Sequence, residues 1–155
     1  MRSILLDTNI LLLLIVGTYG RQLIGQHKRT KIFTPEDYDL LVKHIEPYQR
    51  WWVTSHSLGE VSNLLRQTRT QQQAKALMAC FATLCNGLKE SHIGKDRLFQ
   101  DALYMRLGIT DTGIMLKAKR VNCVLTVDLD LHNEILKRGY KSENFNHLRS
   151  KHLLT

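Results

Sequence analysis

The chain of 155 residues lacks an apolar run long enough to cross a bilayer. The apolar stretch near the N-terminus extends only over residues 10–16, whereas a membrane-spanning helix needs about 20 residues. Asp7 and Asn9 interrupt the apolar segment that follows Arg2, and no small-residue cleavage site follows it, which argues against a secretory signal. We therefore expect a protein with no membrane segment.

Cysteine is also scarce, and the three cysteines are an odd number. An odd count argues against a disulfide framework and favours a reducing compartment, so we expect a cytoplasmic location. The seven histidines show no pairing at metal-ligand spacing, which argues against a zinc site. Glycine-rich phosphate loops and the G-x-S-x-G elbow are absent, which argues against the nucleotide-binding and serine-hydrolase classes that use them.

Positive charge is what the sequence has in excess. The chain carries 22 Lys and Arg against 14 Asp and Glu, a formal net charge of +8. Such a balance favours a polyanionic partner such as nucleic acid, or an acidic protein. Because 43% of the residues are hydrophobic and no repeat or linker interrupts them, we expect residues 1–155 to form a single domain with a sizeable core.

Segments of strand character alternate with segments of helical periodicity along the chain. Strands are expected at 3–7, 51–54 and 121–127, with a further edge strand near Phe145. Helices are expected at 9–16, 34–46, 57–68, 74–85, 96–107, from 110 onward and at 131–137, with a basic loop or broken helix over 17–33. Strands separated by helices predict an α/β fold, a three-layer sandwich with a short, mainly parallel sheet flanked by helices.

Four acidic residues occupy related positions in this pattern. Asp7 and Asp128 each follow an apolar strand, and Glu60 and Asp111 each stand near the expected start of a helix. Side chains at the carboxyl ends of parallel strands line the crevice where ligands bind. Three of the acids also have an ordinary explanation, because Asp7 suits a turn, Glu60 would form a capping box with Ser57, and Asp111 would complement a helix dipole. The joint order of the four is therefore the stronger signal.

These acids stand in motifs that resemble the PIN-domain ribonucleases, a family that includes the toxins of toxin–antitoxin pairs. The resemblance rests on Leu-Leu-Asp-Thr-Asn-Ile at 5–10, the helical Glu60, Gly-Ile-Thr-Asp at 108–111 and Val-Leu-Thr-Val-Asp at 124–128, and it spans residues 3 to about 140. It implies a metal-dependent endoribonuclease, the toxin of a pair, that hydrolyses RNA phosphodiester bonds. It further implies a small antitoxin partner and a homodimer, for which the helices at 34–46 and 57–68 offer apolar residues.

By the same resemblance, the catalytic and metal-binding residues are Asp7, Glu60, Asp111 and Asp128, which hold one or two Mg²⁺ or Mn²⁺ ions. Asn9 and Thr126 are the polar neighbours that orient these carboxylates. The chemistry is consistent, because hard cations take carboxylate oxygens, and four crowded carboxylates without a cation raise one another's pKa values. Asp130 is either a fifth ligand or the N-cap of the helix from Leu131, and its residue type favours the cap.

Two basic clusters are candidates for RNA contacts because each lies about two helical turns beyond a proposed ligand. They are Arg66 with Arg69, and Lys117 with Lys119 and Arg120. For any one of these residues an ordinary solvated position is the favoured explanation. Trp51 and Trp52 could stack on bases, but in a strand their packing against the core is favoured. Two alternatives to the ribonuclease remain: a non-catalytic RNA-binding or protein-interaction module with this fold, and a nuclease acting on structured DNA.

Overall fold

A five-stranded parallel sheet runs through the centre of the molecule in the order β3-β2-β1-β4-β5. The computed structural model describes residues 1–154. The strands are β1 (Ser3–Leu6), β2 (Arg50–Thr54), β3 (Lys89–Ser91), β4 (Cys123–Thr126) and β5 (Ser142–Asn144). Because every pair is parallel, the carboxyl ends of all five strands meet at one edge, and the predicted α/β class is confirmed.

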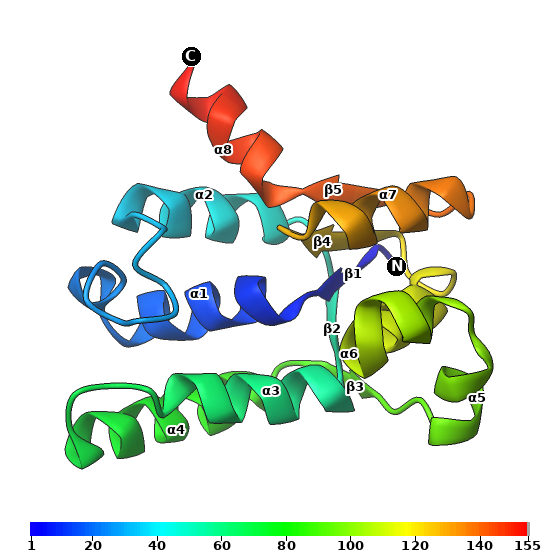
Figure 1. Cartoon of the computed structure of the whole chain (residues 1–155). Helices are drawn as coiled ribbons and strands as arrows, with labels where there is room; N and C mark the ends of the chain where they lie inside the picture. The colour runs from blue at the N-terminus through cyan, green and yellow to red at the C-terminus, as the bar shows by residue number, and fades with distance from the viewer. Residues whose placement is uncertain (155) are drawn as a thin grey trace.

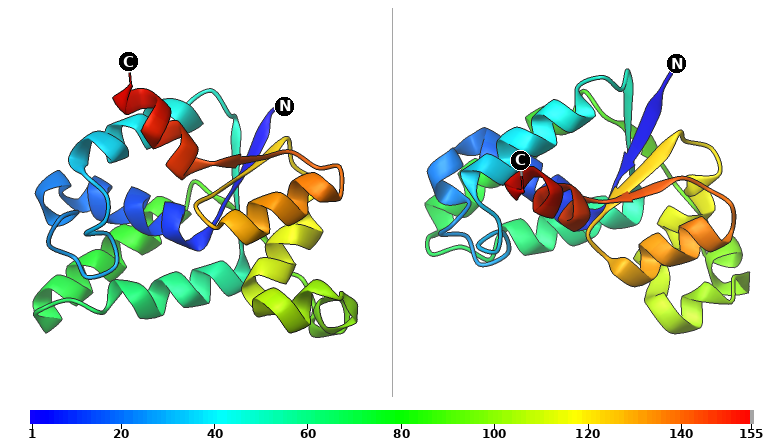
Figure 2. Two further views of the ribbon diagram at one scale, coloured as in Figure 1. Left: turned by 45° about the horizontal axis from the view of Figure 1, so that its top comes forward. Right: turned by 90° about the horizontal axis from the view of Figure 1, so that it is seen from above.

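Helices cover both faces of this sheet, as Figures 1 and 2 show. On one side lie α1 (Thr8–Tyr19), the short 3-10 turn η1 (Arg21–Leu23), α2 (Pro35–Ile45), α3 (Ser55–Leu65), α4 (Gln71–Cys85) and α8 (Phe145–Leu153). On the other lie α5 (Lys95–Gln100), α6 (Leu103–Ala118) and α7 (Leu129–Lys137). Strand β1 separates the two cores, because Ile4 and Leu6 pack on the first side and Leu5 on the second. The three-layer sandwich is therefore confirmed.

The apolar stretch at 10–16 lies in the interior as the central part of α1, and every residue in it is buried. Helix α1 has only 12 residues and packs against α2, α3, α4 and β4. A helix surrounded by protein on all sides is apolar around its whole circumference, which explains a run that reads like a membrane segment. In residues 1–154 no helix is long and apolar enough to span a bilayer.

Local sequence signals placed most element boundaries correctly. Thr34 caps α2 and forms a capping box with Asp37, and Pro35 takes the first helical position. The expected break before Thr110 is present inside α6, where Gly108 has φ 87° and ψ −177°. The single helix expected at 96–107 is wrong, because α5 ends at Gln100 and α6 begins at Leu103. The edge strand near Phe145 is β5, which ends one residue before it.

Two capping predictions were wrong. Helix α3 begins at Ser55 with Thr54 as its N-cap, so Ser57 and Glu60 form no capping box there. Helix α7 begins at Leu129 with Asp128 as its N-cap, so the cap is not Asp130. In both cases a capping residue nearer the end of the strand starts the helix earlier than the sequence pattern indicated. Strand β3 was not predicted, because its Lys-Glu-Ser sequence is polar and lies at the edge of the sheet.

Candidate active site

Asp7 lies at the carboxyl end of β1 and is 5% exposed. It is the N-cap of α1, where its Oδ1 accepts a hydrogen bond of 2.7 Å from the Thr8 N–H. Its Oδ2 accepts a hydrogen bond of 2.5 Å from the hydroxyl of Thr126, the last residue of β4. Both carboxylate oxygens of Asp7 are therefore oriented by the protein.

Asp128 stands beside this pair at the end of β4. Its N–H donates to the Thr126 hydroxyl oxygen at 3.0 Å, and its Oδ1 accepts from the Leu131 N–H at 3.0 Å as the cap of α7. Thr126 is fully buried and so bridges the two acids, donating to one and accepting from the backbone of the other. Thr126 thus contacts Asp7 through its side chain, and its role in orienting metal ligands stays a prediction.

Glu60 and Asp111 reach the site from two helices. Glu60 is exposed in the second turn of α3, and its Oε2 accepts a hydrogen bond of 2.7 Å from the Thr110 hydroxyl. Thr110 and Asp111 lie in the first turn after the Gly108 break, which the Thr112 hydroxyl closes by donating to the Gly108 carbonyl at 2.6 Å. The break therefore starts a new helical segment that contains Asp111 and contacts Glu60 through Thr110.

The four carboxylates are close enough to interact electrostatically. Burial raises the pKa of Asp111 to about 7, with further contributions from Asp7, Asp128 and Glu60. Burial also raises the pKa of Asp7 to about 6, against the hydrogen bonds from Thr126 and Thr8, and Asp128 and Glu60 raise it further. Within residues 1–154 neither Asp7 nor Asp111 forms an ion pair with a basic side chain. The site therefore holds negative charge that a cation would offset.

The donor set fits Mg²⁺ or Mn²⁺, because every candidate ligand is a carboxylate oxygen and these ions prefer hard oxygen ligands. The raised pKa values of Asp7 and Asp111 are what uncompensated carboxylates produce in a partly desolvated site. In the described chain, no three Asp, Glu, His or Cys side chains are gathered at the spacing of a metal centre.

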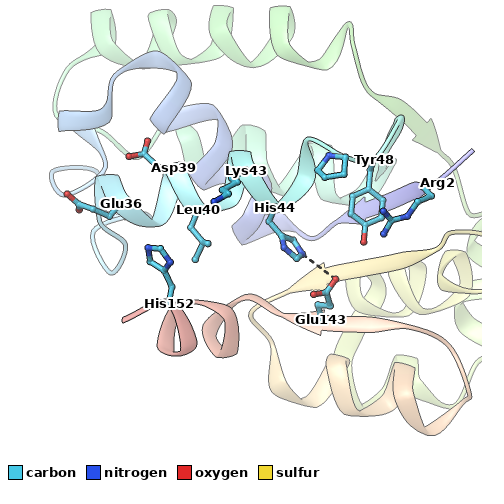
Figure 3. Close-up of a pocket in the computed structure, with 10 residues that line it drawn as sticks. Arg2, Glu36, Asp39, Leu40, Lys43, His44, Tyr48, Glu143 and His152 are labelled. Carbon is cyan, nitrogen blue, oxygen red and sulfur yellow. Dashed lines mark hydrogen bonds and ion pairs between the residues drawn. The ribbon is translucent and has the colours of Figure 1, made fainter. Parts of the chain in front are cut away.

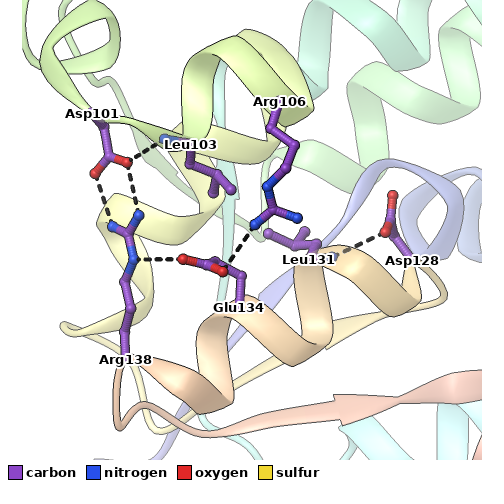
Figure 4. A network of polar contacts seen from close by, with 7 residues as sticks. All are labelled: Asp101, Leu103, Arg106, Asp128, Leu131, Glu134 and Arg138. Atoms are coloured by element: carbon purple, nitrogen blue, oxygen red, sulfur yellow. Dashed lines mark hydrogen bonds and ion pairs between the residues drawn. The ribbon is translucent and has the colours of Figure 1, made fainter.

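An ion-pair network joins the two helices that carry Asp111 and Asp128 (Figure 4). Arg138 at the end of α7 donates two hydrogen bonds of 2.8 Å to Asp101, which precedes α6, and one of 3.2 Å to Glu134. Arg106 on α6 donates to the same Glu134 at 3.0 Å. Because bidentate Arg–carboxylate pairs are geometrically specific, this network fixes α7 against α6 behind the acids.

Hydroxyl groups to which the sequence pattern assigned no role beside the acids extend from Thr8, next to Asp7, to the end of β2. The Thr8 hydroxyl lies 3.4 Å from the Ser57 hydroxyl, and the Thr54 hydroxyl lies 3.1 Å from the same oxygen. Thr110, which holds Glu60, was also missed as an orienting residue. Their positions in the sequence could have identified these residues, since each lies at or just after the end of a strand or next to an acid.

Asn9 and Asp130 each follow a proposed ligand by two residues, in the first turn of a helix. Asn9 is exposed on α1, and within the described residues its side chain donates no hydrogen bond to a carboxylate. Asp130 is exposed in the first turn of α7.

The Lys117 ammonium lies 3.6 Å from the centre of the Trp52 ring, and the Trp51 Nε1 donates to the Ile45 and Tyr48 carbonyls. Both tryptophans therefore pack, as the sequence favoured.

The two basic clusters lie on different sides of the site. Lys119 and Arg120 follow α6 near the starts of the strands, since the Asn122 N–H bonds to the Ser3 carbonyl. The acids lie beyond the opposite ends of these strands, so this cluster points away from them. Arg66 and Arg69 are exposed just after α3, the helix that carries Glu60.

A mixed-charge groove of about 610 Å³ lies between α2 and β5 (Figure 3). His44 on α2 pairs with Glu143 on β5 at 3.2 Å, and the Arg2 guanidinium lies 4.5 Å from the centre of the Tyr48 ring. Arg2 precedes β1 whereas Asp7 follows it, so this groove opens at the other end of the strand. It contributes nothing to the acidic site.

Comparisons with known proteins leave the function open. No family model matches the chain, and no curated protein matches it. A solved domain of a functionally unknown protein from Methanocaldococcus jannaschii DSM 2661 is similar in structure, with a TM-score of 0.49 and 12% sequence identity. The similarity covers 93% of this chain and 91% of that one, and it carries no inference about activity.

Proposed function

We propose that the chain is a metal-dependent endoribonuclease. The observation that carries this proposal is the electrostatic interaction among Asp7, Glu60, Asp111 and Asp128, which come from four elements at one edge of the sheet and, with burial, raise the pKa values of Asp7 and Asp111. Because no three of these side chains are gathered at metal-centre spacing in residues 1–154, binding an ion would require their side chains to move closer together. Carboxylates crowded in this way are stabilised by a divalent cation. A bound Mg²⁺ or Mn²⁺ ion would supply the Lewis acid that polarises a phosphodiester and lowers the pKa of a water molecule.

The chain's own residues orient the groups that would hold such an ion. Thr126 and the Thr8 N–H fix the two oxygens of Asp7, and the start of α7 fixes Asp128. Thr110 fixes one oxygen of Glu60 and leaves the other available as a ligand. Fixing carboxylates before the ion binds reduces the entropy lost on binding.

RNA is the proposed substrate because the net charge of +8 attracts a polyanion. As the toxin of a pair, the protein would be inhibited by a small antitoxin, and a homodimer is the proposed assembly. Large exposed apolar side chains available for such contacts include Phe99, Met105, Leu129 and Leu136. They belong to α5, α6 and α7, whereas none of the large exposed apolar residues lies on α2 or α3, the helices that the sequence pattern suggested.

The test is incubation of the purified protein with a mixed pool of single-stranded RNA, with Mn²⁺ or with EDTA, followed by gel analysis of fragments. The matched variants are Asp111→Asn and Asp130→Asn, since both replace an acid in the first turn of a helical segment and only the first lies among the acids. We expect Mn²⁺-dependent cleavage by the wild type and Asp130→Asn, and a loss of at least a hundredfold in Asp111→Asn.

Equal cleavage by both variants, or cleavage that persists in EDTA, would contradict the proposal. A parallel arm with DNA flaps distinguishes a nuclease for structured DNA. The second candidate, a non-catalytic RNA-binding module, is favoured by Arg66 and Arg69 beyond α3, which are exposed and form no ion pair within residues 1–154. Metal-independent RNA binding without cleavage would support that module.

A further inference from the structure

A second groove, of about 820 Å³, lies at the far ends of α1 and α3. We call it the basic cleft. Its lining residues are Leu23, Gly25, Gln26, Lys28, Lys31, Gln67, Thr68, Arg69, Thr70 and Gln73. They come from two segments that are distant in sequence, the connection between α1 and α2 and the turn between α3 and α4. Figures 1 and 2 show these two segments side by side.

The cleft has fixed walls. His27 is 1% exposed, and its Nε2 lies 3.1 Å from the Leu65 carbonyl at the end of α3. Arg29 donates to Gln67 at 2.7 Å, and the buried Thr30 hydroxyl donates to the Ile24 carbonyl at 2.8 Å. These contacts attach the connection between α1 and α2 to the end of α3, so the groove exists before any ligand binds.

All charge in the cleft has one sign. Lys28, Lys31 and Arg69 are exposed, and in residues 1–154 none of them forms an ion pair. No acidic residue lines the groove. The remaining polar groups are amides and hydroxyls, which can donate hydrogen bonds to phosphate oxygens or to base edges. The cleft therefore has the chemistry of a site for phosphates.

An exposed strip of α3 connects the cleft to the acids. Glu60, Asn63 and Arg66 recur at intervals of three residues and are all exposed, so they share one side of the helix. The Arg66 guanidinium donates a hydrogen bond of 3.2 Å to the side-chain Oδ1 of Asn63 on this side of the helix. At about 1.5 Å of rise per residue, the cleft lies on the order of 15 Å from Glu60.

We propose that the basic cleft binds the phosphodiester backbone of a single RNA strand and that the strand follows the exposed side of α3 to the carboxylates. The cleavage at the end of this path rests on the proposed function, whereas the binding does not. The volume of the cleft suits a ligand of a few nucleotides rather than a duplex. An acidic protein segment is the competing occupant, and the test separates it from RNA.

The experiment compares two triple variants that each remove three positive charges. The cleft variant is Lys28→Gln, Lys31→Gln and Arg69→Gln, and the control variant is Lys89→Gln, Lys137→Gln and Lys151→Gln. All six side chains are exposed and none has an ion pair in the described chain, so both variants should keep the wild-type melting temperature. Binding of a fluorescent single-stranded RNA of mixed sequence is measured by anisotropy in EDTA, over a range of salt concentrations.

We expect the cleft variant to bind RNA at least tenfold more weakly and the control variant to change by less than about threefold. The dependence of log K on log salt should become shallower by about 2 in the cleft variant, from three lost phosphate contacts on a single strand. Equal weakening of both variants, or an unchanged cleft variant, would overturn the proposal.

A poly-glutamate peptide that competes as well as RNA at equal charge would overturn the proposal in favour of a protein partner. Cleft-dependent RNA binding by a wild type that cleaves nothing in Mn²⁺ would support the cleft while refuting the nuclease. The two proposals can therefore fail separately.

Discussion

The Thr126 hydroxyl donates a hydrogen bond of 2.5 Å to Oδ2 of Asp7, joining two residues that lie 119 apart in sequence. The Thr126 hydroxyl oxygen also accepts a hydrogen bond from the Asp128 N–H, so one buried side chain at the end of β4 contacts two of the four acids. Burial raises the pKa of Asp7 to about 6, whereas the hydrogen bond from Thr126 favours the ionised carboxylate and opposes this rise. Thr126 therefore helps to keep a buried carboxylate charged.

Replacing Thr126 with Val should destabilise the protein by about 1.5–3 kcal/mol when Asp7 is ionised, because a charged acceptor loses its donor. The loss should be larger at pH 8 than at pH 5, since the pKa of Asp7 lies at about 6. Thermal unfolding at both pH values measures it. Thr126→Ser keeps the hydroxyl and should retain most of the stability, and a Ser variant as unstable as the Val variant would contradict the role of the hydrogen bond.

The pH dependence of stability follows from Asp7 and Asp111, whose pKa values rise from 3.8 to about 6 and about 7 on folding. A group with a raised folded pKa contributes stability below its unfolded pKa and loses it as the pH rises through the folded value. The metal-free wild type should therefore lose stability relative to Asp111→Asn between pH 4 and pH 8.

At pH 8 in EDTA, we expect Asp111→Asn to be more stable than the wild type by about 1–2 kcal/mol, after allowance for solvent screening. At pH 4 the difference should vanish. Asp130→Asn, at an exposed position, serves as the control. A pH-independent difference between wild type and Asp111→Asn would show that repulsion among the acids is not its source.

Gly108 has a backbone conformation that side chains rarely adopt, with φ 87° and ψ −177°. A Cβ there would meet nothing within 4 Å, so Gly108→Ala should cost about 1–3 kcal/mol through conformation alone. Gly59 also has open space but lies within α3, so Gly59→Ala should stabilise by about 0.5–1 kcal/mol. Urea unfolding of both variants checks the opposite signs, and matching signs would argue against the break at Gly108.

Arg138 holds the pKa of Asp101 at about 2 through its paired hydrogen bonds. A lowered pKa contributes stability above the unfolded value of 3.8 and loses it as the pH falls through about 2. We expect Arg138→Ala to cost about 1–2 kcal/mol at pH 7 and progressively less below pH 4. A double-mutant cycle with Asp101→Ala at pH 7 measures the pair, and a coupling energy near zero would contradict this prediction.

The sequence was most informative where local chemistry decides the structure. Thr34 and Pro35 start α2 through local capping chemistry. The apolar runs before Asp7 and Asp128 favour strands, and these strands end just before the two acids. A parallel sheet places both acids at the same edge, which the pattern predicts, whereas their proximity depends on the pairing of β1 with β4, which the sequence pattern did not predict.

Features that depend on packing between distant segments could not be predicted from the sequence pattern. The spacing between Asp111 and Lys117 does not reveal that α6 carries the lysine toward the starts of the strands, where it covers Trp52. The basic cleft needs the contact of His27 with Leu65, which joins segments 38 residues apart. Long-range contacts of this kind leave no periodic signal in the sequence.

The central claim is that the four carboxylates hold a divalent cation, and thermal unfolding with and without Mn²⁺ tests it most directly. A ligand that binds only the folded state stabilises it by RT ln(1 + [L]/Kd), about 2.7 kcal/mol at a hundred times Kd, and so raises the melting temperature. We expect Mn²⁺ to raise the melting temperature of the wild type clearly, most of this rise to be lost in Asp7→Asn, and all of it to be retained in Asp130→Asn. Equal shifts in the wild type and Asp7→Asn would contradict it.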